Sequence, residues 1–115
     1  MKFICLVYAE PGAVSNLPDA EREALDRDSL AYDERLSAGG HFLAASALQG
    51  VKTARTVRVR QGKPVVLDGP FAETKEVLCG FIFIEAADAD EAMRLAEGIP
   101  MARVGTIEVR PELRF

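Results

Sequence analysis

The chain has few of the residues from which metal centres and disulfide frameworks are built. It contains one histidine and two cysteines among 115 residues. Cys5 and Cys79 each lie inside an apolar run, with neither a second cysteine nor the histidine nearby in sequence. Isolated cysteines of this kind are typical of reduced core residues in a cytoplasmic protein. Scattered ligands also make a poor metal set, so we expect neither a metal site nor a cofactor.

Long hydrophobic runs and an excess of positive charge are missing as well. Every apolar run is far shorter than the roughly 20 residues that a membrane helix needs. The N-terminus starts directly with a strand-like run, which favours a cytoplasmic protein without a signal peptide. The net charge of -4 disfavours binding to a nucleic-acid backbone. No nucleophile–base pair and no glycine-rich phosphate loop is recognisable.

The composition is that of a single globular domain. Hydrophobic residues make up 49% of the chain and charged residues 28%, which argues against disorder. A chain of this length buries enough surface for one core and too little for two.

Periodicity and turn residues predict strands separated by two helices. The expected strands are residues 3–8, 41–48, 54–60, 64–67, 78–84 and 106–110, with Gln61-Gly62-Lys63 as a hairpin turn. A long helix is expected from about Pro18 to Ala38, with Asn16 as a possible cap and Gly39-Gly40 at its end. A second helix should open in capping-box style at Asp88 and Glu91, and end at Gly98 and Pro100.

This order of elements predicts an α+β sandwich with two helices on one face of a mainly antiparallel sheet. Residues 3–8 and 78–84 are apolar on both faces of their strands, whereas two helices can cover only one face. A second copy of the sheet is the simplest cover for the other face, so we predict a homodimer.

Two residues of the first helix region are candidates for acid–base chemistry. Asp28 falls within an apolar helical stripe and is expected to act as a base or substrate anchor with a raised pKa. Two alternatives are that the helix is slightly rotated, or that Asp28 pairs with an arginine. His41 follows the helix and is the only side chain whose ordinary pKa suits proton transfer at neutral pH. A lone surface histidine is the alternative for His41.

Polar side chains also follow the alternating strands. Arg58, Arg60, Glu108 and Arg110 can line a polar cleft or bind a carboxylate if they share a sheet face. The alternative is a solvated sheet face.

The stretch from Asp68 to Glu76 combines a turn with a dense group of charges. Lys75 can hold an anion, Glu73 or Asp68 can accept a proton, and Phe71 can form the wall of a pocket. Alternatively, Asp68 hydrogen-bonds the loop backbone and Phe71 fills the edge of the core. That alternative leaves Glu73 to Glu76 unexplained, so a functional role is expected mainly there.

Residues 68–76, Asp-Gly-Pro-Phe-Ala-Glu-Thr-Lys-Glu, closely resemble the signature of the DGPF-domain proteins of the YCII-related family. Residues 57–60, 80–85 and 105–111 are similar to the family pattern too. The resemblance implies a ferredoxin-like α+β fold that pairs into a dimeric α/β barrel, in a bacterial cytoplasmic protein often associated with sigma factors. Some relatives carry a His–Asp pair proposed as an active site. Here the first helix contains Asp28 but no histidine.

Two functions follow as hypotheses. The first is a cofactor-independent acid–base enzyme for a small organic molecule, with its pocket between the sheet and the first helix. Asp28 or Asp68 would act as the base, Lys75 and Arg58 would hold an anionic group, and Phe71 and Tyr32 would form walls. The second is a non-enzymatic ligand-binding or regulatory dimer associated with a sigma factor system.

Overall fold

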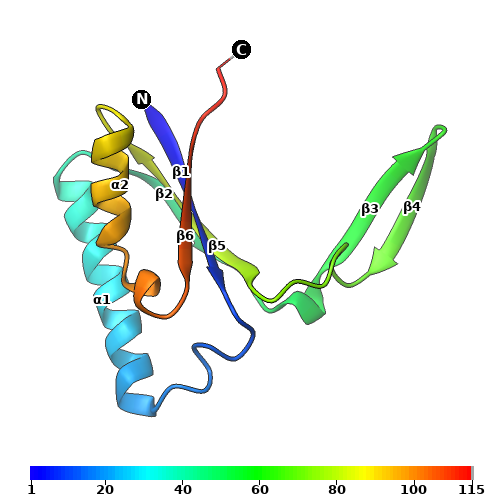
Figure 1. Ribbon diagram of the computed structural model, residues 1–115, viewed down its shortest axis with the longest axis horizontal. Helices are drawn as coiled ribbons and strands as arrows, with labels where there is room; N and C mark the ends of the chain where they lie inside the picture. Colours follow the sequence, from blue (N-terminus) through cyan, green and yellow to red (C-terminus); the bar gives the residue numbers. More distant parts are fainter. Residues whose placement is uncertain (115) are drawn as a thin grey trace.

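A four-stranded antiparallel sheet forms the centre of the computed structural model, which describes residues 1–114 (Figure 1). Its strands are β1 (Lys2–Ala9), β2 (Phe42–Ala47), β5 (Val77–Glu85) and β6 (Thr106–Pro111). They lie side by side in the order β2-β5-β1-β6. The first strand thus pairs with the two strands that precede and follow the second helix, which is the ferredoxin-like order. No helix within residues 1–114 combines the length and apolarity that crossing a membrane requires.

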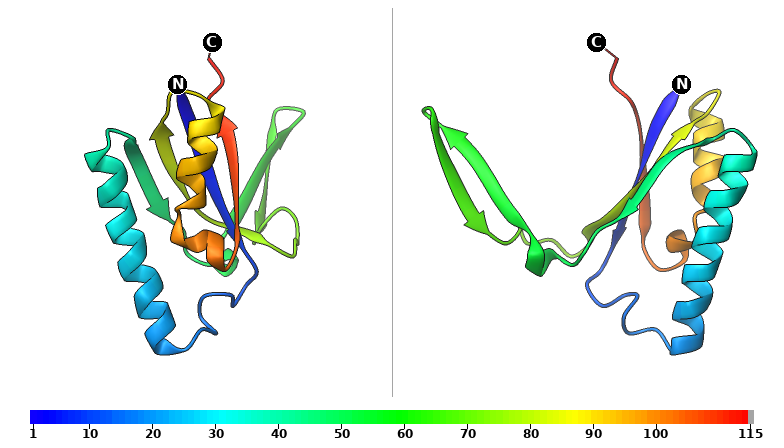
Figure 2. Two further views of the ribbon diagram at one scale, coloured as in Figure 1. Left: turned by 60° about the vertical axis from the view of Figure 1, so that its left-hand side comes forward. Right: turned by 180° about the vertical axis from the view of Figure 1, so that it is seen from behind.

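Both helices cover the same face of this sheet (Figures 1 and 2). They are α1 (Asp19–Ala38) and α2 (Ala89–Glu97), and a short 3₁₀ helix, η2 (Pro100–Arg103), follows α2. Alternate residues of β1 point toward the helices and are buried, among them Phe3 and Cys5. They pack with Leu36 of α1 and Ala92 of α2 in one core. The predicted α+β sandwich is therefore confirmed.

The two helices begin by different means. At α2 the amide of Glu91 donates to Asp88 Oδ1 at 2.8 Å, so the predicted cap is present. The carboxylate of Glu91 accepts from the amide of Ala87 at 2.9 Å, one residue before the cap amide that a capping box would use. At α1 the cap position is Pro18, and no side chain caps the helix. The prediction that Asn16 caps α1 was wrong. The fixed φ of proline and acidic side chains in the first turn favour the start of the helix instead.

The buried stripe of α1 is rotated from the predicted one. Leu25 and Leu36 are buried, whereas Ala31 is exposed. Burying two leucines removes more apolar surface from water than burying alanines, so the helix turns toward its leucines. The inward face consequently runs through positions 25, 29, 32 and 36, and Asp28 lies at its margin.

A hairpin separate from the central sheet projects away from the body of the protein (Figure 2). We call it the arm, residues 55–68, formed by β3 (Arg55–Arg60) and β4 (Lys63–Asp68). Gln61 and Gly62 connect the strands with φ of 52° and 75°, as a tight hairpin turn with the sheet's own twist requires. Arg58 and Arg60 therefore lie in a different sheet from Glu108 and Arg110, and the four do not line one cleft.

The face of the central sheet that points away from the helices is apolar at its centre. The register places Ile4 beside Phe83 and Leu6 beside Phe81 on this face. We call these four residues the open face. All four side chains remain partly exposed, and neither helix covers them within residues 1–114. At the β6 edge the face ends in an ion pair of Glu108 with Arg110 at 2.8 Å.

The burial of Cys5 makes the stability of the fold sensitive to alkaline pH. Burial raises the pKa of this thiol from 9.0 to about 11. Between these values the folded chain holds a proton that the unfolded chain has lost, so the free energy of unfolding falls as pH rises. Two pKa units correspond to about 2.7 kcal/mol, a loss that is complete only above the folded-state pKa.

Urea unfolding measured from pH 7.5 to 10.5 should show this loss in the natural protein. A Cys5→Ala variant should start less stable because of the cavity it creates, but its stability should decline less with pH. Other alkaline titrations are common to both proteins and cancel in the difference. Parallel stability curves for the two proteins would contradict the assignment.

Candidate functional site

The largest cavity lies between α1 and the side of β2 and β5 that faces the helices. Its volume is about 620 Å³, within the range of about 300–1,000 Å³ in which ligand pockets fall. We call it the α1 cavity. Most of its lining is apolar, and Leu25, Ile82 and Met101 are among the residues that form it.

Small residues in the sheet create this cavity. Ala45 and Ala47 of β2 and Gly80 of β5 line it at positions where large side chains would fill the space. Gly80 is also required by the close approach of β2, because a Cβ atom there would lie 2.5 Å from the carbonyl oxygen of Ser46. The alanine-rich sequence of β2 is thus the local cause of the hollow beneath α1.

The polar side of the α1 cavity is acidic. Asp26, Ser29 and Asp33 line it from successive turns of α1. Burial raises the pKa of the Asp33 carboxyl above its ordinary value. No lysine, arginine or histidine is among the lining residues in the described part of the chain. Asp33 therefore offers a carboxylate of increased basicity to whatever occupies the cavity.

Cys79 also lines the α1 cavity but is not an activated nucleophile. Its thiol donates to the carbonyl oxygen of Val77 at 3.3 Å. Burial raises its pKa, so the thiol remains protonated near neutral pH. The chemistry available in the α1 cavity is consequently carboxylate acid–base chemistry.

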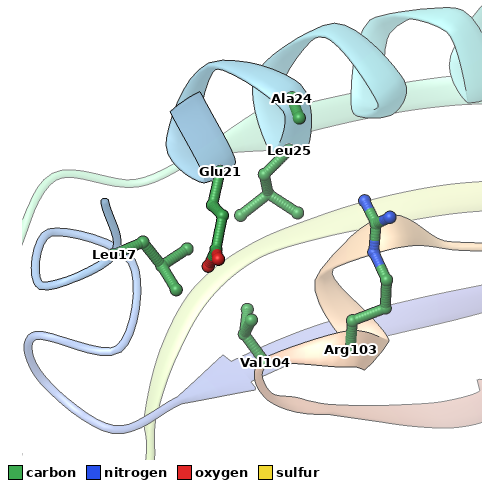
Figure 3. Close-up of a pocket in the computed structure, with 6 residues that line it drawn as sticks. All are labelled: Leu17, Glu21, Ala24, Leu25, Arg103 and Val104. Carbon is green, nitrogen blue, oxygen red and sulfur yellow. The ribbon is translucent and has the colours of Figure 1, made fainter. Parts of the chain in front are cut away.

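Two smaller hollows also adjoin α1, one near its N-terminal end and the other between its middle and the end of α2. One, of about 260 Å³, is formed by residues such as Leu17, Glu21 and Val104, as Figure 3 shows. The other, of about 290 Å³, includes Asp28, Tyr32 and Arg103. Both fall below the usual size of ligand pockets, and the second has a more polar lining than the α1 cavity.

Asp28 and Tyr32, predicted as site residues, lie outside the α1 cavity. Asp28 accepts a hydrogen bond from Arg103 at 3.1 Å, which is the arginine pairing considered as an alternative. The Tyr32 hydroxyl donates to the carbonyl oxygen of Leu95 at 2.6 Å and so links α1 to α2. Its ring lies where a Cβ atom on Gly98 would be, so the glycine makes room for it.

His41 lies at the start of β2 and has local partners. Its Nδ1 is 2.8 Å from the carbonyl oxygen of Glu85, so this nitrogen carries the proton that is donated. Glu91 Oε1 lies 3.9 Å from the same nitrogen. The histidine thereby joins β2 to the end of β5, away from the residues that line the α1 cavity.

The loop from Asp68 to Glu76 does not converge on a cavity within residues 1–114. Asp68 pairs with Arg55 at 3.3 Å at the base of the arm, rather than closing an Asx-type turn. Lys75 lies 3.4 Å from Glu10. Phe71 is 72% exposed, so it neither fills the edge of the core nor forms a pocket wall in this chain.

The rest of the loop and arm candidates are exposed as well. Glu73 projects into solvent after the turn, and Arg58 does so from the arm. Glu76 is tied to the sheet, because its carboxylate accepts a hydrogen bond from the Thr106 hydroxyl at 3.0 Å. The predicted residues are thus distributed over several parts of the surface.

Sequence reasoning missed Asp33 and Asp26. Both lie on the side of α1 that faces β2, whereas the predicted apolar stripe was centred on the side of α1 that carries Asp28. The available signal was the run of small residues at 44–47, which indicates space beneath the helix that packs on that strand.

The model of the YCII-related domain matches residues 1–115. The chain belongs to the YCII-related family. An uncharacterised protein of Rhizobium meliloti (strain 1021) is 35% identical over 113 residues, which span 96% of this chain and 91% of that protein.

A solved structure shares the fold of this YCII-related chain. It is the 5-chloro-2-hydroxyhydroquinone dehydrochlorinase from Burkholderia phenoliruptrix AC1100, in complex with 2,5-dihydroxybenzoquinone. The TM-score is 0.61 at 19% identity, over 100% of this chain and 96% of the other. At this identity the likeness supports the fold, and with it the predicted ferredoxin-like arrangement.

Proposed function

We propose that this YCII-related protein binds a small organic molecule in the α1 cavity and exchanges a proton with it through Asp33. The observation that carries the proposal is a carboxylate with a raised pKa on the wall of the largest, mostly apolar cavity. A raised pKa brings a carboxylate closer to the operating pH, where a general base is most effective. The solved structure of the same fold holds a small ring compound, which makes ring compounds a sensible first class to test.

The charge of the cavity restricts the ligand. Asp26 and Asp33 supply its charged groups, and no basic side chain lines it within residues 1–114. An anion would meet like charge without a counterion, whereas a neutral or cationic molecule would not. We therefore expect a neutral or cationic ligand, in place of the anion that Lys75 and Arg58 were expected to hold.

Three phenyl compounds of equal shape and different charge test this function. Benzylamine and benzyl alcohol, at millimolar concentration, should raise the melting temperature by mass action, and benzoate should not. Asp33→Asn should reduce the shift caused by benzylamine while largely keeping that caused by benzyl alcohol. Asp28→Asn is the matched control, because Asp28 lies on the same helix but outside the α1 cavity.

The outcomes separate the parts of the proposal. If benzoate stabilises the protein as well as benzylamine does, the cavity binds ligands but the expectation of a neutral or cationic ligand is wrong. If no compound in a wider fragment set of all three charge types shifts the melting temperature, the α1 cavity is not a ligand site. If bound compounds are always recovered unchanged, without hydrogen exchange, the non-enzymatic binding alternative is favoured.

The assembly is the second part of the proposal. The open face, formed by Ile4, Leu6, Phe81 and Phe83, is a patch of large apolar side chains on the two central strands. Packing it against the same face of a second copy would remove this surface from water without disturbing the helices. We infer a homodimer with its two sheets face to face, as the dimeric α/β barrel implied by the sequence resemblance requires.

A further inference from the structure

The arm exposes more apolar surface than a free hairpin can sustain. Val57, Val59 and Val66 are 65%, 61% and 55% exposed. A two-stranded hairpin without other packing is at best marginally stable in water. Apolar surface of this extent on a protruding element indicates a surface that is covered in the working protein.

The register sorts the arm into two distinct faces. Val57 lies opposite Val66, and Val59 lies opposite Pro64, so these four residues form one apolar face. Val65 and Leu67 lie on the other face, where they alternate with Arg58 and Arg60 across the pair. An antiparallel hairpin commonly keeps one face polar toward solvent and covers its apolar face, so the face formed by Val57, Val59, Pro64 and Val66 is the one that lacks a cover.

The base of the arm is firmly held. The amide of Gly69 donates to the carbonyl oxygen of Ala54 at 2.7 Å, and the Thr56 hydroxyl donates to the carbonyl oxygen of Gly69 at 2.9 Å. The ion pair of Arg55 with Asp68 crosses the same end of the hairpin. These contacts join the two strands of the hairpin where it begins, so the arm is a closed and defined element up to its base.

The charge of the arm is opposite to that of the rest of the protein. The arm carries four basic residues and one acid, a net charge of +3. The whole chain has a net charge of -4, so the remainder carries -7. A second copy of this chain therefore offers the arm a surface of complementary sign.

The arm also stands in the right place for a second copy. It projects on the side of the central sheet opposite to α1 and α2, and leaves a wide angle between itself and the open face (Figures 1 and 2). A second copy that packs on the open face would enter this angle.

We propose that the arm of each copy packs its apolar face against the body of the other copy and so clamps the homodimer. The inference rests on the homodimer proposed above and assigns a role to the arm, none of whose residues lines the α1 cavity. Two-fold symmetry then makes both arms equivalent, each extending past the edge of the partner's sheet.

Charge placed on the apolar face of the arm tests the inference. Val57→Asp combined with Val59→Asp should raise the dissociation constant of the dimer at least 100-fold in sedimentation equilibrium. Met93→Asp is the matched control, because Met93 is 51% exposed on α2, on the helix side of the sheet, and should leave the constant unchanged. Arg58→Glu should weaken the dimer too, and should flatten its dependence on salt.

A photo-cross-linking amino acid at position 59 gives a second measurement that does not depend on a destabilised arm. In a mixture of ¹⁴N- and ¹⁵N-labelled protein whose subunits have exchanged, the cross-linked peptides should include pairs that combine one chain of each label. Cross-links confined to single chains would overturn the proposal, as would a natural protein that is monomeric. If the arm variants dimerise like the natural protein while charged open-face variants dissociate, the clamp is wrong and the sheet-to-sheet dimer stands.

Discussion

Replacing Asp33 with asparagine is expected to lower the rate of proton exchange with a bound molecule by about 10²- to 10⁴-fold. The change preserves the shape of the side chain but removes the oxygen that accepts the proton. Asp33 is the lining carboxylate whose pKa burial raises, whereas Asp26 is exposed. The same change at Asp26 should therefore have a smaller effect.

Deuterium uptake from D₂O into a neutral cyclic ketone, followed by ¹H NMR, measures this exchange directly. Asp28→Asn should behave like the natural protein, because Asp28 pairs with Arg103 outside the α1 cavity. The base must be deprotonated, so the rate should fall on the acidic side, at a pH above that at which an ordinary aspartate titrates. This fall of the rate at acidic pH should vanish in the Asp33→Asn protein. An unchanged pH dependence in that variant would assign the base to another group.

The fold was accessible from sequence because its signals are local and agree with one another. The cap at Asp88 fixes the start of α2, and Gly39 ends α1 where it was predicted to end. Strands apolar on both faces identified the centre of the sheet. The cap of α1 was misplaced because Pro18, which offers no side-chain acceptor, starts that helix instead of Asn16.

The site was less accessible, because it depends on a small rotation of α1. Shifting the stripe from Ala31 toward Leu36 moves Asp28 to the flank near Arg103 and brings Asp33 to the flank near β2. Periodicity locates a helical stripe to within about one residue, or roughly 100° around the axis. A rotation of α1 by that angle is enough to move a carboxylate from the inside of a cavity to an ion pair outside it.

The loop of residues 68–76 shows a similar limit to what sequence patterns can predict. Glu73 to Glu76 looked unexplained by structure, yet Lys75 contacts Glu10 and Glu76 contacts Thr106. These bonds connect residues that are distant in sequence, and no local pattern encodes them. Phe71, for which packing had offered an explanation, is instead exposed. An aromatic ring in that position is consistent with contact to a second copy, since it lies just beyond the arm.

Charge on the open face should separate the proposed homodimer into monomers. Leu6→Asp together with Phe83→Asp would place two carboxylates between packed apolar sheets. The basic residues of the same face, Lys2 and Arg110, lie toward its edges, and Arg110 is already paired with Glu108. Burying an unpaired carboxylate costs several kcal/mol, so the charged protein is expected to be monomeric at micromolar concentration. Size-exclusion chromatography with light scattering measures the change, with Met93→Asp as the control that should remain dimeric.

The same variant separates assembly from ligand binding. Both substitutions lie on the face opposite to the core residues Phe3 and Ile84, so each chain should keep its helix-covered core. The α1 cavity is formed within one chain and on the helix side of the sheet, so the benzylamine-induced rise in melting temperature should persist in the monomer. A monomer that stays folded but no longer responds to benzylamine would show that the second copy contributes to the site, whereas a natural protein that is already monomeric would refute the dimer itself.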